Sequence, residues 1–296
     1  MRVLSLILAV ACCATGCFSS SAPREEEENC RLFASVIGRT GEINNYHSDL
    51  LSYGRPQSQQ SNGWSLSAYS EYYEGGLLPV PREPMIIRSQ VPSHQDLVVF
   101  DATVELLTRL HPRIVIGHLR SASSGCTQVA DPHPFRGEVD GRIFLAGHNG
   151  GIWGQDLEHL VDKMFYAQPQ IESCPDQPVD SEYLIRNLYE YLNRSQDDDF
   201  DAIFYWTCRV YRGLTRYWSA INLVITNGST IWALRCSRVP DAYPLHYRST
   251  EDRDCHIVST EEIPGSDWTE IPNLVLMEFV PGSPPRQRTI PPRPPE

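Results

Sequence analysis

Short apolar runs of strand type lie on both sides of a helical centre, and this order constrains the fold of the 296-residue chain more than any other feature. The central residues 155–165, 181–192 and 198–217 have helical periodicity, and a further helix is expected over 96–110. Strands are expected before and after this centre, at 30–38, 63–69, 113–118, 142–148, 220–226, 231–235, 256–259 and 274–279. Such an order predicts an α+β fold with two sheets and helices packed outside them.

The first 29 residues are expected to lie outside the folded domain. Residues 1–17 begin with a positive charge and an apolar run too short to span a membrane, which is typical of an export signal. Their last four residues end in Cys17 and resemble the lipobox of bacterial lipoproteins, where this cysteine is acylated after cleavage; an ordinary signal peptide is the alternative. Residues 18–29 form a polar acidic linker or propeptide. We therefore expect an exported protein, either periplasmic or membrane-anchored through a lipid on Cys17.

Composition divides the rest of the chain into two parts. Residues 30–280 contain no linker-like break and no internal repeat, which indicates one mixed domain. Residues 281–296 are rich in proline, which cannot continue a helix or a strand ladder, so we expect a disordered tail. An Asn227-Gly228 pair predicts a hairpin turn between two of the later strands.

Charge and cysteine spacing exclude several classes of function. The chain has 25 basic and 37 acidic residues and a net charge of −12, so it lacks the excess of cations that a nucleic-acid surface needs. Because no later apolar stretch approaches the length of a membrane span, contact with a membrane is expected only through a lipid anchor. No cysteine pair has CxxC spacing, and we expect neither a metal site nor a cofactor.

Cys30 opens a predicted strand directly after the acidic leader. A cysteine in such a position is most often a small buried hydrophobe. If the bond between Asn29 and Cys30 were cut, Cys30 would carry both a thiol and an α-amine. An α-amine has a pKa of about 7.7–8.0, so it could act as the base for the thiol of the same residue. Arg120 follows the end of another apolar strand, where its guanidinium could bind a substrate carboxylate or lie on the surface.

Two further segments admit both a structural and a catalytic interpretation. The pair Asn149-Gly150 follows an apolar strand and predicts a tight turn, whose amides could form an oxyanion hole. Asp180 and Ser181 lie before a helical run, where either could cap the helix, and Asp180 could instead bind an ammonium group. His118 and His148 lie at the ends of two strands, and we expect both to be buried, hydrogen-bonded core residues.

In their order along the chain these segments resemble the class II glutamine amidotransferases, which have the fold of the N-terminal-nucleophile hydrolases. The resemblance is carried by Cys30-Arg31-Leu32-Phe33, Asn62-Gly63-Trp64, the His-x-Arg-x-Ala-x-x-Gly segment 118–125, His133-Pro134-Phe135, His148-Asn149-Gly150 and Asp180-Ser181-Glu182. It continues through segments 222–228, 233–235 and 258–261, and is strongest to the stand-alone amidohydrolases of the family. It implies a four-layer αββα sandwich covering nearly all of residues 30–280.

The resemblance also implies a role for each matched residue. Cys30 would be the nucleophile, and Asn149 and Gly150 would form the oxyanion hole. Arg120 would bind the α-carboxylate of the substrate, and Asp180 its α-ammonium group. The substrate would be glutamine or a γ-glutamyl amide, hydrolysed through a thioester on the cysteine.

The sequence departs from the family pattern in three places. Family members normally begin with Met-Cys, whereas Cys30 lies behind a leader, so we expect a second cleavage after Asn29. Ser-Ala-Ser follows Arg120 where an Arg-Ala-Thr type of sequence is more usual, and Asn62 lies where Asp is common.

Three functions remain open at this stage. The first is a hydrolase of glutamine or γ-glutamyl compounds, acting alone or as a subunit that supplies ammonia to a separate acceptor. The second is an N-terminal-cysteine acylase that acts on another amide. The third is a non-catalytic exported binding protein with the same fold.

Overall fold

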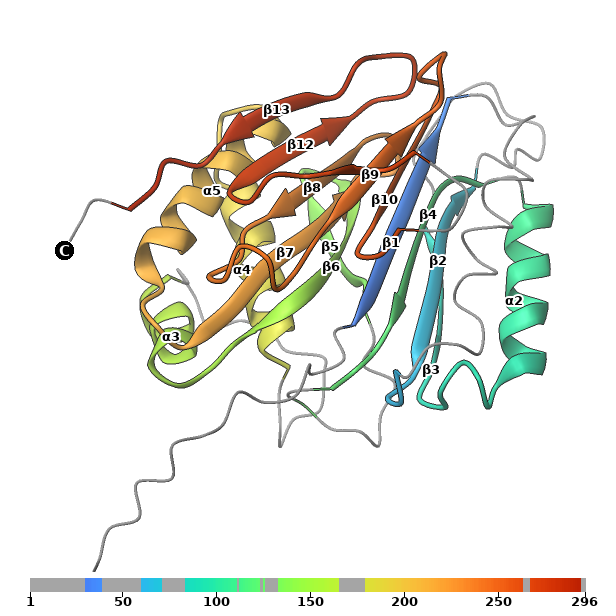
Figure 1. Ribbon diagram of the computed structural model, residues 1–296, viewed down its shortest axis with the longest axis horizontal. Helices are drawn as coiled ribbons and strands as arrows, with labels where there is room; N and C mark the ends of the chain where they lie inside the picture. The colour runs from blue at the N-terminus through green and yellow to red at the C-terminus, as the bar shows by residue number, and fades with distance from the viewer. Residues whose placement is uncertain are drawn as a thin grey trace, which may run out of the picture.

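A computed structural model of the protein describes residues 30–38, 60–70, 83–110, 112–122, 125, 133–164, 179–262 and 267–293. The leader with Cys17, and the last three residues of the tail, lie outside these ranges. The described residues form two antiparallel sheets that pack face to face (Figure 1).

The first sheet consists of β1 (Arg31–Ile37), β2 (Trp64–Ser70), β3 (Met85–Ser89), β4 (Pro112–Leu119), β9 (His246–Ser249), β10 (Cys255–Ser259) and β11 (Thr269–Glu270). The second consists of β5 (Phe135–Val139), β6 (Arg142–Ile152), β7 (Trp218–Thr226), β8 (Ile231–Arg235), β12 (Val275–Phe279) and β13 (Arg286–Thr289). Their orders are β11-β9-β10-β1-β4-β2-β3 and β13-β12-β8-β7-β6-β5. All strands expected from the sequence are confirmed, and β1 and β4 lie side by side in the middle of the first sheet.

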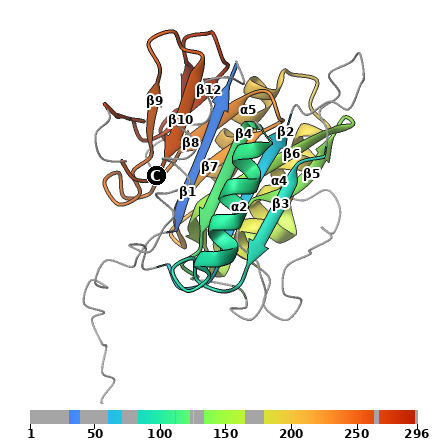
Figure 2. The same ribbon diagram turned by 90° about the vertical axis from the view of Figure 1, so that its right-hand side faces the viewer.

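Helices cover the outer face of each sheet (Figures 1 and 2). The first sheet carries α2 (Leu97–Arg109), and the second carries α4 (Asp180–Leu192) and α5 (Asp199–Gly213). A short helix α3 (Gly154–His159) continues into the π-helical turn η1 (Leu160–Met164). This arrangement confirms the predicted αββα sandwich. None of the helices in the described ranges is both long enough and apolar enough to cross a membrane.

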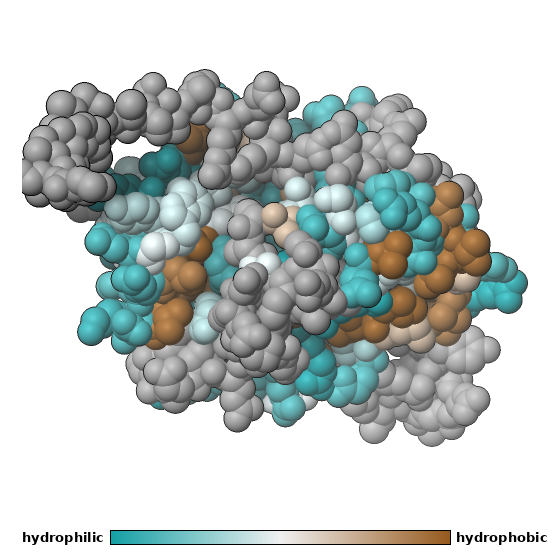
Figure 3. All heavy atoms as spheres, turned by 90° about the horizontal axis from the view of Figure 1, so that it is seen from below, coloured by the Kyte–Doolittle hydropathy of each residue, from teal (hydrophilic) through white to brown (hydrophobic). Residues whose placement is uncertain are grey.

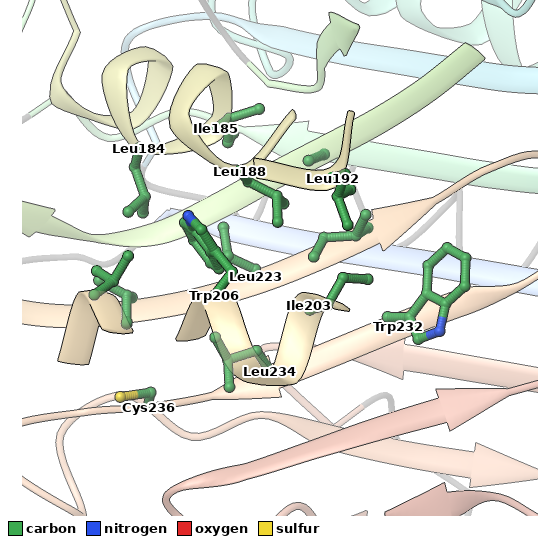
Figure 4. Close-up of a cluster of buried hydrophobic side chains, with 14 of the residues drawn as sticks. Leu184, Ile185, Leu188, Leu192, Ile203, Trp206, Leu223, Trp232, Leu234 and Cys236 are labelled. Atoms are coloured by element: carbon green, nitrogen blue, oxygen red, sulfur yellow. The ribbon is translucent and has the colours of Figure 1, made fainter. Parts of the chain in front are cut away.

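Alternation along the strands sends apolar side chains to both faces of each sheet. In β1, Leu32 and Val36 pack between the sheets, whereas Phe33 and Ile37 pack toward α2. Each such fully buried side chain contributes roughly 1.5–3 kcal/mol of transfer free energy. A further core fills the space between the second sheet and its helices, where Figure 4 shows Trp206 of α5 among leucines of α4, β7 and β8.

The outward face of α2 is unusually apolar for a surface helix. Val98 is 84% exposed and Val99 50%, whereas only Phe100, Thr103 and Leu107 of this helix are buried. Viewed from below, the molecule shows hydrophobic residues gathered on the side where α2 lies (Figure 3). One helix therefore covers the first sheet with only a narrow buried stripe.

One expectation about an element end is wrong. The helix predicted over 198–217 ends at Gly213, because Asp156 takes the next backbone amides: its Oδ1 accepts from Thr215 N at 2.8 Å and its Oδ2 from Tyr217 N at 2.6 Å. The predicted loop at Asn227-Gly228 is confirmed as the connection between β7 and β8.

The proline-rich tail is ordered where proline is absent, contrary to the expectation of a disordered segment. Residues 286–289 lie between two proline clusters. Each of these four residues keeps the N–H that a strand ladder needs, so the segment pairs with β12 as the edge strand β13. Their arginines pack on α5. The guanidinium carbons of Arg286 and Arg288 lie 4.0 and 3.7 Å from the ring centroids of Phe200 and Phe204.

Candidate active site

Cys30 lies at the start of β1, and its thiol meets the backbone just beyond β4. The Sγ atom lies 3.2 Å from both Ser121 N, which donates to it, and Ser121 O, to which the thiol donates. Burial raises the pKa of the Cys30 thiol to about 11, although the Ser121 backbone and the charge of Arg120 act to lower it, and Asp180 adds to the rise. The thiol is therefore protonated at neutral pH, and it would need a base to react as a nucleophile.

The first residues of β1 are fixed by the segment that follows β10. Leu32 N donates to Thr260 Oγ1 at 3.2 Å, and Thr260 N donates to Leu32 O at 3.0 Å. Arg31 forms an ion pair with Glu261, with 2.6 Å between Nε and Oε1. These contacts hold the backbone next to Cys30 on the side away from β4.

Arg120 is 4% exposed and follows β4 directly. Because Arg31 pairs with Leu119 in the β1–β4 ladder, Arg120 lies next to Cys30. Its backbone is held by the Asn62-Gly63 segment: Arg120 N donates to Gly63 O at 2.9 Å, and Asn62 N donates to Arg120 O at 3.1 Å.

The same segment fixes the residues after Arg120. Asn62 Oδ1 accepts from Ala122 N at 2.9 Å. Gly63 has a φ of +95°, and a Cβ there would lie 2.2 Å from Ser89 O, so this close approach requires glycine. The Asn-Gly-Trp motif thus has a clear local task, which is to shape the backbone that contacts the Cys30 thiol.

Asn149 and Gly150 lie inside β6, so the predicted tight turn is wrong. The strand continues to Ile152, and its register with β7 shifts between Gly150 and Ile152. Gly150 has a φ of +142°, and a Cβ there would lie 2.1 Å from Ala220 O. The glycine is therefore needed for the close passage of β6 over β7, and the irregularity changes the direction of the amides in the same way that a bulge does.

Asp180 is the first residue of α4 and is 3% exposed. The helix cap is Val179, which makes no side-chain capping bond, so the capping interpretation of Asp180 is wrong. Its Oδ2 instead accepts from Ile152 N at 2.8 Å, at the end of β6. Asp180 therefore joins α4 to the strand that carries Asn149.

The structure brings Cys30, Arg120 and Asp180 together at one end of the sandwich, and Asn149 and Gly150 lie on β6, the strand that Asp180 contacts. The charges of Arg120 and Asp180 both act on the Cys30 thiol. Across the sheets, a Cβ on Gly147 would lie 2.5 Å from Leu32 Cδ1, so β6 passes directly beside the start of β1. A cation, an anion and a thiol at one site are the groups that could hold an α-amino acid and attack its side chain.

His118 and His148 are buried and hydrogen bonded, as expected. His118 Nδ1 accepts from His133 N at 3.1 Å, and its Nε2 lies 3.0 Å from His133 Nδ1. Burial lowers the pKa of all three histidines, that of His118 to about 3. The three imidazoles are thus neutral at neutral pH, and no three potential metal ligands cluster in the described part of the chain.

Sequence reasoning did not assign a role to Ser121, Thr260 or Glu261, and it treated Ser181 only as a candidate helix cap, whereas the cap is Val179. Thr260 and Glu261 were within a motif that supported the resemblance, but only the pairing of β1 with β10 shows that they contact the residues beside Cys30. The contact of Ser121 with the thiol is made by its backbone, so no side-chain signal could have indicated it.

Comparison with known proteins decides the family. The profile of the class-II glutamine amidotransferases matches residues 30–251, beginning at Cys30. The chain belongs to this family. The match includes every residue of the site described above except those of the segment after β10.

Two curated relatives support the assignment at lower coverage. An uncharacterized protein of Methanocaldococcus jannaschii is 23% identical over 263 residues, which are 79% of this chain and 65% of that protein. A protein of Haemophilus influenzae named putative glutamine amidotransferase is 30% identical over 139 residues, 45% of this chain and 40% of that one. The chain thus spans less than two thirds of either relative.

Solved structures show the same fold at low sequence identity. A glutamine aminotransferase class-II domain protein from Silicibacter pomeroyi has a TM-score of 0.54 and 17% identity, and the match covers 89% of this chain and 100% of that one. The glutamine phosphoribosylpyrophosphate amidotransferase of Bacillus subtilis has a TM-score of 0.56 and 14% identity, with 88% and 49% covered. The common feature is the pair of packed antiparallel sheets.

Proposed function

We propose that this chain hydrolyses glutamine or a γ-glutamyl amide through a thioester on Cys30. The observation that carries the proposal is the buried pair of opposite charges, Arg120 and Asp180, acting on one thiol. An arginine can bind the α-carboxylate of an amino acid through two parallel hydrogen bonds, and an aspartate can bind its α-ammonium group. The side-chain amide of the bound substrate would then lie over the sulfur.

In the proposed reaction the α-amine of Cys30 takes the thiol proton, and the sulfur attacks the amide carbon. The carbonyl electron pair moves to oxygen, where the side-chain amide of Asn149 and the backbone N–H of Gly150 stabilise the negative charge. Collapse breaks the C–N bond, and the leaving amine takes the proton from the α-ammonium. Water then adds to the thioester, glutamate leaves, and the thiol is restored. This sequence uses no metal and no cofactor.

The proposal requires removal of the leader after Asn29. With a thiol pKa of about 11, fewer than roughly one thiol in a thousand is ionised at neutral pH, and the nitrogen of an intact peptide bond cannot take its proton. The family match that begins at Cys30 supports this cleavage. We further propose that residues 1–17 export the protein and that Cys17 carries the lipid. Cleavage after Asn29 would then release the domain.

Mass spectrometry of the mature N-terminus tests the mechanism, together with turnover of glutamine and of γ-glutamyl amides. We expect a chain that starts at Cys30 and loses all turnover in Cys30→Ala. A chain that starts earlier and still hydrolyses these substrates would contradict the mechanism.

Two variants test substrate recognition. Asp180→Asn keeps an oxygen for the bond from Ile152 N but removes the charge, and Arg120→Ala removes the cation. Because a hydrogen bond to a charged group contributes about 1.5–3 kcal/mol, each variant should raise KM at least tenfold. The exposed Arg109→Ala is the control.

Other outcomes identify the alternatives. An enzyme whose amide hydrolysis is indifferent to both substitutions is an acylase of a different amide. A Cys30 that stays unprocessed and does not react with an electrophilic glutamine analogue indicates a binding protein. Glutamine turnover that rises when a second protein is added would identify an ammonia acceptor.

A further inference from the structure

The first turn of α4 contacts β6 on both sides of Asn149 and Gly150. Before this pair, the Ser181 hydroxyl lies 2.8 Å from His148 Nδ1. After it, Asp180 Oδ2 accepts from Ile152 N at 2.8 Å. Adjacent residues of one helix thus hold the strand at two points that flank the amides of the oxyanion hole.

The chemistry of its two partners fixes the proton position on His148. Ala220 O, 3.1 Å from Nε2, can only accept, so Nε2 carries the proton. In a neutral ring Nδ1 then accepts from the Ser181 hydroxyl. His148 is 1% exposed, and its burial favours this neutral form. The imidazole therefore joins α4, β6 and β7 through two directional bonds.

The partner on β7 is also the group that Gly150 approaches. A Cβ on Gly150 would lie 2.1 Å from Ala220 O, the same oxygen that accepts from His148. A shift of the His148 imidazole therefore moves β6 and β7 relative to each other at the place where their register changes.

We propose that His148 and Ser181 are positioning residues that fix the oxyanion-hole amides of Asn149 and Gly150 relative to Asp180. This inference depends on the proposed hydrolase function. Neither residue contacts the substrate; both act through β6. Donors in an oxyanion hole must lie within about 2.7–3.1 Å of the developing negative charge. A small displacement of β6 therefore weakens the stabilisation of the transition state.

Ser181→Ala should lower kcat about tenfold or more and change KM less than twofold. The oxyanion exists only in the transition state, whereas Asp180 keeps its bond to Ile152 and still binds the ground-state ammonium. His148→Gln removes the ring Nδ1 that accepts from the same hydroxyl, while the glutamine amide nitrogen can still donate to Ala220 O. The double variant Ser181→Ala/His148→Gln should therefore be no slower than His148→Gln alone, because both substitutions remove the same hydrogen bond between Ser181 and His148.

The chain provides a matched control in the other sheet. His256 of β10 is also buried, with the Ser249 hydroxyl 2.7 Å from its Nδ1 and Val280 O 3.2 Å from its Nε2. Ser249→Ala and His256→Gln remove an equivalent bond far along the first sheet from Cys30. They should lower the melting temperature by about as much as the β6 variants and leave kcat unchanged.

Steady-state kinetics and melting curves of the processed enzyme and all five variants decide the matter. Loss of kcat confined to the Ser181 and His148 variants, without additivity, supports the inference. Equal effects of Ser181→Ala and Ser249→Ala on kcat, or a loss expressed only in KM, would overturn it. A wild-type protein that turns over no γ-glutamyl amide refutes the proposed function, and this inference with it.

Discussion

Mild acid should destabilise this protein, because two hydrogen-bonded histidines are buried as neutral groups. Burial, with the positive charge of Arg120 next in size, lowers the pKa of His118 to about 3. Burial and the neighbouring His118 lower the pKa of His133 well below its ordinary value. The two side chains are at most 4% exposed. A proton added to either ring would bring charge into the core beside the cations Arg120 and Arg88.

The sign of the effect follows from linkage. The unfolded chain binds these protons with a pKa of about 6.5, whereas the folded chain binds them only at much lower pH. The stability due to the neutral histidines is therefore fully present above pH 6.5 and is lost as the pH falls toward the folded pKa. At pH 5.0 His118 removes about 2 kcal/mol, and His133 acts in the same direction. A typical domain has a total stability of only about 5–15 kcal/mol.

Urea unfolding between pH 7.5 and pH 5.0, followed by the fluorescence of the buried tryptophans, measures this slope. His118→Asn removes one of the titrating groups, so below pH 6 its slope should be smaller than that of the wild type by about 1.4 kcal/mol per pH unit. His159 is exposed on α3, and His159→Asn should leave the slope unchanged. If His118→Asn and wild type lose stability in parallel, the rings are not the cause of the acid sensitivity.

Three further changes have expected outcomes. Gly150→Ala should abolish turnover and lower stability by about 1–3 kcal/mol in thermal melts, because its φ of +142° and a carbonyl oxygen 2.1 Å from the new Cβ oppose it; a normal enzyme would contradict this. Arg288→Met should cost about 1 kcal/mol, read as a 2–4 °C lower Tm, by losing the stack on Phe204; an unchanged Tm would show that the tail adds no stability. Glu261→Gln should lower kcat severalfold with little change in Tm, because it removes the negative charge that pairs with Arg31 beside the proposed nucleophile Cys30; equal kcat would refute this.

The strands that the sequence predicted are those with long apolar runs, and the ones it missed are short or polar. β8 is buried along its full length and β7 is buried at all but one position. The sequence of each strand therefore shows an apolar run that predicts it without reference to its neighbours. In contrast, β9 and β11 have exposed or half-exposed residues and are held by pairing with neighbours. Pairing of this kind depends on distant parts of the chain and leaves no local period to detect.

The site shows the same division between local and distant causes. The positions of Cys30 and Arg120 next to strand ends were predicted correctly, since the sequence predicts both strands well. The Asn149-Gly150 pair was expected to be a turn, because Asn-Gly locally favours one. The actual requirement for glycine is the approach of Ala220 O from the next strand, which only the fold reveals.

The geometry of the proposed active site is a property of the packing between the two sheets. Cys30 and Arg120 come from the first sheet, whereas Asn149 and Asp180 belong to the second sheet and its helix layer. Gly147 lets Leu32 approach β6, since even a Cβ would lie 2.5 Å from Leu32 Cδ1. A larger residue at this point would separate the sheets beside Cys30. The distance from the Cys30 sulfur to the proposed oxyanion-hole amides is thus set by the same close packing that stabilises the sandwich, and the proposed activity should be more sensitive than stability to changes in this layer.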